Sequence, residues 1–235
     1  MDLNDREKDL LEGLKGVTKS ALSIIPGLGQ AIAGWDSYQR SNFEKNLLKT
    51  IKFLEDKVAN LQSFFSGDFF RTEEGQQFTR KVFDCAFDTQ YEDKQELFIN
   101  ALVNGADIRN YSELERLKFV DMLRNLSRAS LLVLAEMHKT FIKDVRGPNR
   151  SPDSTSAFPL INSAQIAEKL GSKFHPYLVT SAINEMESQG LFSETGEWKK
   201  SSFDGSYVSG PGFTSGLCYT DFTARFVEFI STKDT

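Results

Sequence analysis

The sequence predicts a mainly helical protein, with an N-terminal multi-helix bundle that includes one long helix and a small α+β domain after it. Apolar side chains recur at helical spacing through the first part of the chain, which is typical of amphipathic helices. A run of turn-forming residues follows, and glycine-rich strand candidates appear only after it. We therefore expect a helical bundle over residues 1–145, a linker over 146–158 and an α+β domain over 159–235.

The first expected helix begins near Asn4 and presents one apolar face as far as Ile25. Pro26 and Gly27 interrupt it, because proline removes a helical hydrogen bond and glycine permits a chain reversal. The interruption lies within an uncharged stretch from Ser20 to Trp35, which is the first candidate functional segment. Its candidate contact residues are Ile24, Ile25, Pro26, Gly27, Leu28, Gly29, Ile32 and Trp35.

Two interpretations of this apolar segment remain open. Glycine allows close helix packing, so the segment can form a tight hairpin inside the core, which its composition favours. It can also be an interfacial element that meets a membrane, with Trp35 and Tyr38 at the level of the headgroups. The segment is shorter than the roughly 20 apolar residues of a spanning helix, so we expect no ordinary transmembrane helix. Gly29 and Gly34 lack the following lysine of a phosphate-binding loop.

The long helix of the bundle is expected from Leu28 to about Phe65. Its apolar residues alternate at spacings of four and three, which is the pattern of a helix-packing seam. Such a seam packs against another helix of the same chain or against a second copy, and the second case predicts a homo-oligomer. The seam consists of Leu47, Ile51, Leu54, Val58, Leu61 and Phe65.

Further helices complete the predicted bundle. Asn104 and Gly105 form a candidate C-terminal cap, and Ser112 with Glu115 matches a capping box. These helices are expected over residues 73–88, 93–104, 112–126 and 129–144.

The pattern after the linker resembles a winged helix-turn-helix. It contains a short helix over 163–170, a second helix over 176–189, a strand from Gly190 and a closing helix over 223–230. Polar and glycine-rich residues lie between the strand candidates. The expected core consists of Ile166, Leu170, Leu178, Ile183, Met186, Leu191 and Phe192.

A winged helix would use the second of these helices to contact DNA. Thr180, Ser181 and Asn184 are the polar candidates on that helix, and Lys199 with Lys200 are candidates on a wing. The helix itself holds two glutamates and no Lys or Arg, and the chain carries a net charge of −5. Because nucleic-acid binding draws on clustered basic residues, we expect a protein contact or a structural role ahead of DNA binding.

No catalytic or metal-binding signature is present, so we expect a protein that is not an enzyme and that uses no cofactor or metal. His138 and His175 are far apart and fit neither a metalloprotease motif nor a defence-ribonuclease motif. Cys85 and Cys218 are isolated, which suits a reduced, cytoplasmic compartment. The acidic N-terminus argues against a secretory signal peptide.

Three patterns carry a family resemblance: Ile25-Pro26-Gly27-x-Gly29, then Arg40-x-x-Phe43-x-x-x-Leu47, then the helix from Glu96 to Asn104. With these the chain resembles the bacterial abortive-infection proteins called Abi-alpha. The resemblance covers roughly residues 10–145. It implies a Pro/Gly-interrupted apolar segment on a helical body, a variable tail, and a role in phage defence that acts on or senses the cell's own membrane. It transfers no catalytic residue.

We therefore expect a non-enzymatic phage-defence protein, cytoplasmic and peripheral at the inner membrane, that acts through the apolar segment. The alternative is a winged-helix transcriptional regulator whose helical body dimerises through the seam. A third interpretation is a scaffold that docks another protein through exposed phenylalanines, of which the chain has many.

Overall fold

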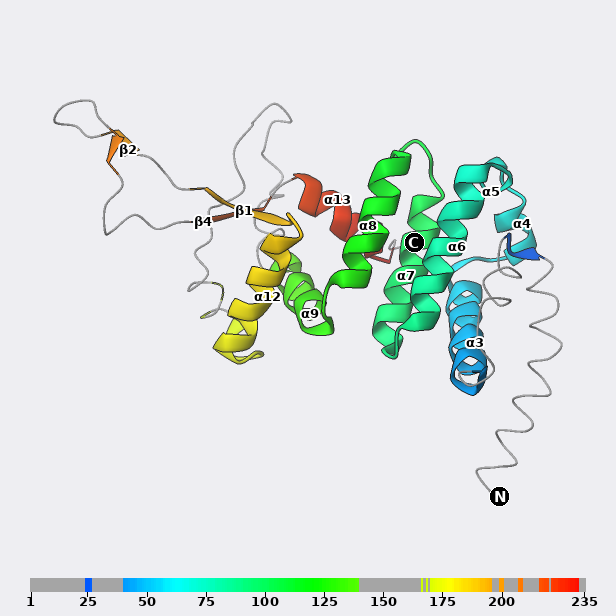
Figure 1. Cartoon of the computed structure of the whole chain (residues 1–235), viewed down its shortest axis with the longest axis horizontal. Helices are drawn as coiled ribbons and strands as arrows, with labels where there is room; N and C mark the ends of the chain where they lie inside the picture. Colours follow the sequence, from blue (N-terminus) through cyan, green and yellow to red (C-terminus); the bar gives the residue numbers. More distant parts are fainter. Residues whose placement is uncertain are drawn as a thin grey trace, which may run out of the picture. The chain divides into compact units, whose positions relative to one another are not determined.

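The structure is a computed structural model that describes residues 24–26, 40–139, 166, 168, 170–195, 199–200, 207–208, 216–219 and 221–232. Within these residues the protein is mainly helical, as the sequence predicts, with nine helices and four short strands (Figure 1). The helices are α3 (Arg40–Lys57), α4 (Leu61–Phe65), α5 (Asp68–Arg71), α6 (Glu73–Asp88), α7 (Glu92–Gly105), α8 (Glu113–Asn125), α9 (Arg128–Met137), α12 (Pro176–Ser188) and α13 (Asp221–Ile230). The strands are β1 (Phe192–Thr195), β2 (Lys199–Lys200), β3 (Tyr207–Val208) and β4 (Gly216–Tyr219).

The chain divides into two compact units. The first unit comprises Met1–Arg124 together with Glu228–Thr235, and the second comprises Asn125–Val227. This division differs from the expected boundary at 146–158, which lies outside the described residues. Helix α9 belongs to the second unit and not to the predicted bundle, because it packs along α12.

The prediction of one continuous helix as far as Phe65 is wrong. Helix α3 ends at Lys57, and α4 begins at Leu61 after a short break. Asn60 causes the restart: it is extended, with φ −156°, and its side-chain oxygen accepts a hydrogen bond from the backbone N–H of Ser63 at 2.8 Å. An asparagine that caps a new helix competes with continuation of the old one.

The predicted seam packs against other helices of the same chain. Leu47, Ile51 and Leu54 are buried where α3 packs against α6 and α7, whereas Val58 and Leu61 are only half-buried. Ion pairs from Lys49 to Glu92 and from Lys57 to Glu96 join α3 to the start of α7. The three most buried seam residues therefore serve intramolecular packing and do not face solvent, where a second copy would need them.

Helix α6 begins at the predicted residue because its N-terminus is capped. The Thr72 hydroxyl accepts a hydrogen bond from the N–H of Gly75 at 3.0 Å and donates one to the Phe69 carbonyl at 2.6 Å. Gly75 is needed for the approach of α5, since a Cβ atom there would lie 1.9 Å from the Phe69 carbonyl oxygen. Glycine is thus the residue that this packing requires.

The capping box of α8 is confirmed. The Glu115 carboxylate accepts hydrogen bonds from the N–H and the hydroxyl of Ser112, both at 2.9 Å. The Glu115 N–H in turn lies 3.4 Å from the Ser112 hydroxyl oxygen. The predicted helices α6, α7 and α8 all exist, with ends within one residue of the predictions.

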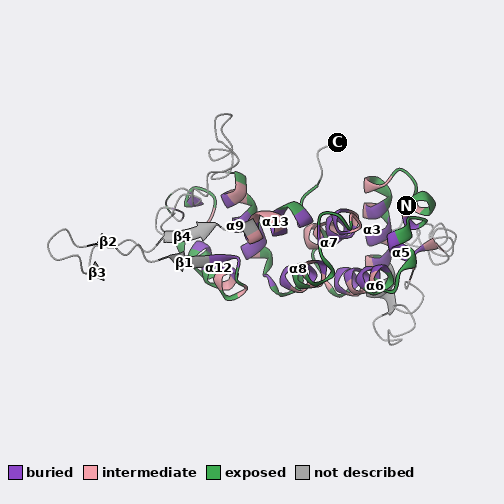
Figure 2. Ribbon diagram, turned by 90° about the horizontal axis from the view of Figure 1, so that it is seen from above, coloured by how far each residue is buried: buried purple, intermediate pink, exposed green. Residues whose placement is uncertain are grey.

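The core of the first unit is aromatic. The Phe229 ring lies 5.1 Å from Tyr111, 5.3 Å from Phe119 and 6.3 Å from Phe78, measured between ring centroids. Gly105 makes room for two of these rings, because a Cβ atom there would lie 2.6 Å from Phe78 and 2.9 Å from Phe229. Figure 2 shows buried residues on α6, α7 and α8, and exposed residues on their other faces.

The second unit combines helices with short strands. Helix α12 packs on α9 and on β1, and β1 pairs antiparallel with β4 in the register that places Phe192 opposite Tyr219. Strands β2 and β3 form a separate antiparallel pair. The described strands therefore form two two-stranded ladders and no larger sheet.

The predicted core of this unit is largely present, with one error. Leu178 is 40% exposed, and the neighbouring Val179 is fully buried in the position that was assigned to Leu178. The periodicity was therefore displaced by one residue at the start of α12. The other predicted core residues are all buried: Ile166, Leu170, Ile183, Met186, Leu191 and Phe192.

We predict that Gly75→Ala lowers the free energy of unfolding by about 1–3 kcal/mol, because the added methyl group collides with backbone that must shift. Urea denaturation followed by circular dichroism measures the loss. Gly67→Ala is the matched control, since a Cβ atom at Gly67 meets the Phe64 carbonyl oxygen at 3.4 Å. Equal losses in the two variants would contradict the packing role of Gly75.

Candidate functional site

The structure describes only part of the apolar segment. Ile25 is 2% exposed, and Ile24 and Pro26 on either side of it are half-buried. The remaining candidate contact residues lie outside the described residues: Gly27, Leu28, Gly29, Ile32 and Trp35. No helix within the described ranges is long and apolar enough to cross a membrane.

The polar candidates on α12 share one exposed face. Thr180, Ser181 and Asn184 are exposed, at the spacing of successive helical turns. Tyr177 precedes them on the same face and is 82% exposed. Lys199 and Lys200 form β2, which pairs with β3. The structure thus places three of the five predicted residues together on one helix.

Glu185 does not lie on that face. Its carboxylate accepts hydrogen bonds from the N–H and the hydroxyl of Ser127, both at 2.6 Å, and contacts the Ser130 hydroxyl. Ser127 is the N-cap of α9, so this carboxylate sits at the positive end of that helix dipole. One of the two acids that the sequence counts against DNA binding is therefore used to dock α12 onto α9.

An ion pair shows the relative direction of α9 and α12. Lys173, just before α12, lies 2.5 Å from Glu136 near the end of α9, and this contact lowers the pKa of the Glu136 carboxyl. Since the other end of α12 binds the start of α9 through Glu185, the two helices are antiparallel. Sequence reasoning missed both contacts, because nothing in the local pattern pairs residues so far apart.

The two histidines lie at helix ends. His175 is the N-cap of α12: its Nδ1 accepts a hydrogen bond from the Tyr177 N–H at 3.4 Å, and the two rings stack with centroids 5.3 Å apart. His138 is the C-cap residue of α9. Both positions have a structural function, and neither histidine belongs to a group of metal-ligating side chains among the described residues.

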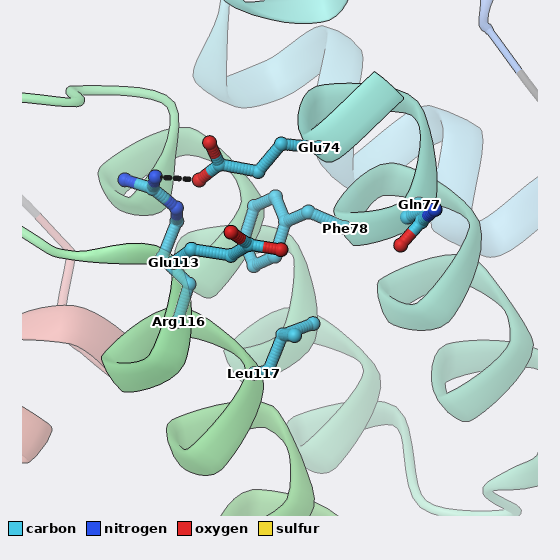
Figure 3. Close-up of a pocket in the computed structure, with 6 residues that line it drawn as sticks. All are labelled: Glu74, Gln77, Phe78, Glu113, Arg116 and Leu117. Atoms are coloured by element: carbon cyan, nitrogen blue, oxygen red, sulfur yellow. Dashed lines mark hydrogen bonds and ion pairs between the residues drawn. The ribbon is translucent and has the colours of Figure 1, made fainter. Parts of the chain in front are cut away.

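A buried arginine lines a small pocket between α6 and α8. Arg116 is 3% exposed and forms an ion pair with Glu74 (Figure 3). Its guanidinium also donates to the Tyr111 carbonyl at 2.5 Å and lies 4.9 Å from the centroid of the Phe69 ring. The remaining lining residues are Gln77, Phe78, Glu113 and Leu117.

This pocket is better explained by structure than by ligand binding. The Arg116 guanidinium bonds the carbonyl groups of Tyr111 and Gly105, which flank the turn between α7 and α8. Two carboxylates from Glu74 and Glu113 line the hollow, and it encloses no space for a water molecule. A buried arginine paired in this way holds the loop and leaves little room for a substrate.

Cys85 is buried on α6, and its thiol is unreactive. Burial raises the pKa of its thiol to about 11, so the thiol is protonated at neutral pH. A reactive cysteine needs a lowered thiol pKa and access to solvent. Cys85 therefore offers no nucleophile.

Comparisons of the chain with protein-family models, with curated proteins and with solved structures find no match. The functional conclusion therefore depends on the residues themselves.

We predict that ionisation of Cys85 weakens the fold between about pH 9 and about pH 11. In this window the thiol of the unfolded chain ionises while the folded thiol keeps its proton, so stability falls as the pH rises. Unfolding free energies of the wild type and Cys85→Ala should diverge across this window by about 1–3 kcal/mol, with the wild type losing more. Parallel pH profiles would contradict the prediction.

Proposed function

We propose that the protein is a non-enzymatic phage-defence protein of the abortive-infection type, which acts on the inner membrane through its apolar segment. In the resting protein the helical body covers this segment, and an infection signal releases it. The observation that carries the proposal is the burial of Ile25, next to a proline in an uncharged stretch that is otherwise out of place in a charged chain. The resemblance to Abi-alpha proteins supports the same function.

Burial of Ile25 fits a concealed membrane element on energetic grounds. An isoleucine side chain gains about 1.5–3 kcal/mol when it leaves water, whether it enters a protein core or a bilayer. An apolar side chain at this position is therefore stabilised in either environment, and only its exposure to water is unfavourable. Ile25 is buried and its described neighbours Ile24 and Pro26 are half-buried, which is compatible with such an element at rest.

We predict that Ile25→Asp abolishes phage protection, because a carboxylate at this position opposes insertion into a bilayer. Bacteria that express the wild type should survive phage challenge as a population and lose membrane potential in infected cells. Wild type isolated from phage-infected cells should also float with vesicles of phosphatidylglycerol and phosphatidylethanolamine and release an enclosed dye. Ile25→Asp should do neither.

Ile108→Asp is the matched control, since Ile108 is 61% exposed and the same change there should leave both readouts intact. Circular dichroism checks that each variant is folded. Unchanged flotation of Ile25→Asp, or no membrane association by the wild type in infected cells, would overturn the proposal.

The alternative is a DNA-binding regulator in which α12 is the recognition helix of a winged-helix domain. The exposed row of Thr180, Ser181 and Asn184 favours it, together with the engagement of Glu185 by α9. Uncharged polar side chains on one helix face can read base edges, and an acid turned away from that face no longer repels phosphates.

This alternative predicts a mobility shift with DNA from the promoter region of its own gene, strongest at low salt. Asn184→Ala combined with Lys199→Ala and Lys200→Ala should remove the shift. Ser188→Ala is the control, because Ser188 is exposed on α12 and its hydroxyl bonds the Glu185 carbonyl of the same helix. No shift at low salt would exclude the alternative.

A further inference from the structure

The C-terminal end of α13 is held in the first unit by two asparagines of α7. The Asn104 side-chain amide nitrogen lies 3.0 Å from the Glu228 carbonyl oxygen, 2.9 Å from that of Phe229 and 2.8 Å from that of Ser231. Asn100 donates to the Ile230 carbonyl at 3.0 Å. The last carbonyl groups of a helix have no partner within it, so these amides provide the cap.

An aromatic anchor accompanies the cap. Phe229 is fully buried among Phe78, Tyr111 and Phe119, in space that the absence of a side chain at Gly105 leaves free. Beyond the helix, the Lys57 amino group donates to the Thr232 hydroxyl at 3.2 Å. Every one of these contacts is made by the five residues from Glu228 to Thr232.

These five residues join the first unit from far along the chain. The rest of that unit ends at Arg124, and the whole of the second unit intervenes. A short segment that is held by two buried side chains, Phe229 and Ile230, and by hydrogen bonds to its carbonyl groups opens at lower free energy than helices that pack along their full length. Its removal would bare three aromatic rings and two amide donors without disrupting the hydrogen bonds within α6, α7 or α8.

We propose that Glu228–Thr232 is a latch: a segment that leaves its seat on α7 as a unit while α6, α7 and α8 stay folded. The seat is formed by Asn100, Asn104, Gly105 and the three aromatic residues around Phe229. Closing the latch completes the aromatic core of the first unit, and opening it exposes that core. The device is independent of whether the protein acts on membranes or on DNA.

Hydrogen exchange of the full-length protein, read by mass spectrometry, tests the latch. Asn104→Leu keeps the approximate volume of the side chain and removes its donors. The peptide that contains residues 226–232 should then exchange about tenfold faster or more, while peptides from α6 and α7 keep their rates. The matched control is Asn46→Leu, because Asn46 caps another helix end by donating to the carbonyls of Phe87 and Thr89.

Asn46→Leu should leave the C-terminal peptide at its wild-type rate. A wild-type rate for that peptide in Asn104→Leu would overturn the latch, and so would equal acceleration by both variants. A second measurement needs no variant: in the wild type, the C-terminal peptide should lose protection at a lower urea concentration than α6 and α7. Simultaneous loss of protection in all three would also overturn the proposal.

Discussion

Helix α7 provides donors for the carbonyl groups at the ends of three other helices, and the arrangement of the first unit depends on this capping. Lys94 donates to the Arg124 carbonyl at the end of α8, at 2.9 Å, and Gln95 donates to the Thr89 carbonyl just beyond α6, at 3.2 Å. Asn100 and Asn104 do the same for α13. Among the described residues only Gly190 has a positive φ, so these helix ends use side-chain donors in place of the common glycine cap.

This form of capping ties secondary structure to tertiary structure. A glycine cap is local, whereas a donor from another helix satisfies the carbonyl groups only when the two helices are packed. Buried amides must also keep their partners, because an unpaired polar group inside the protein costs more than a paired one gains. Gln95, Asn100 and Asn104 are all buried and donate through their amide nitrogens, and the buried Arg116 donates through Nη1 to the Tyr111 carbonyl. Each of these hydrogen bonds requires a particular orientation of its donor and acceptor groups. The packing is therefore specified by hydrogen-bond geometry as well as by the burial of apolar surface.

The candidate sites depend on such long-range pairs. Thr180, Ser181 and Asn184 are exposed on α12, whereas the carboxylate of the neighbouring Glu185 is bonded at the N-terminus of α9. Arginine is a common anion-binding residue, but the Arg116 guanidinium is already paired with Glu74 and with backbone carbonyl groups. The polar residues on α12 could be proposed from sequence, but the direction in which Glu185 points could not, since its partner lies 58 residues away.

The sequence by itself determined the helices and their local ends. Apolar periodicity placed α6, α7, α8 and α12, and the Ser112–Glu115 box marked the start of α8, because these signals act within a few residues. The tertiary structure decided what periodicity cannot encode. It determined the burial of Val179 in place of Leu178, the grouping of α9 with α12 and the return of Phe229 to the first unit. Each depends on which distant surface a helix meets, and helical spacing in a single chain records only that an apolar face exists.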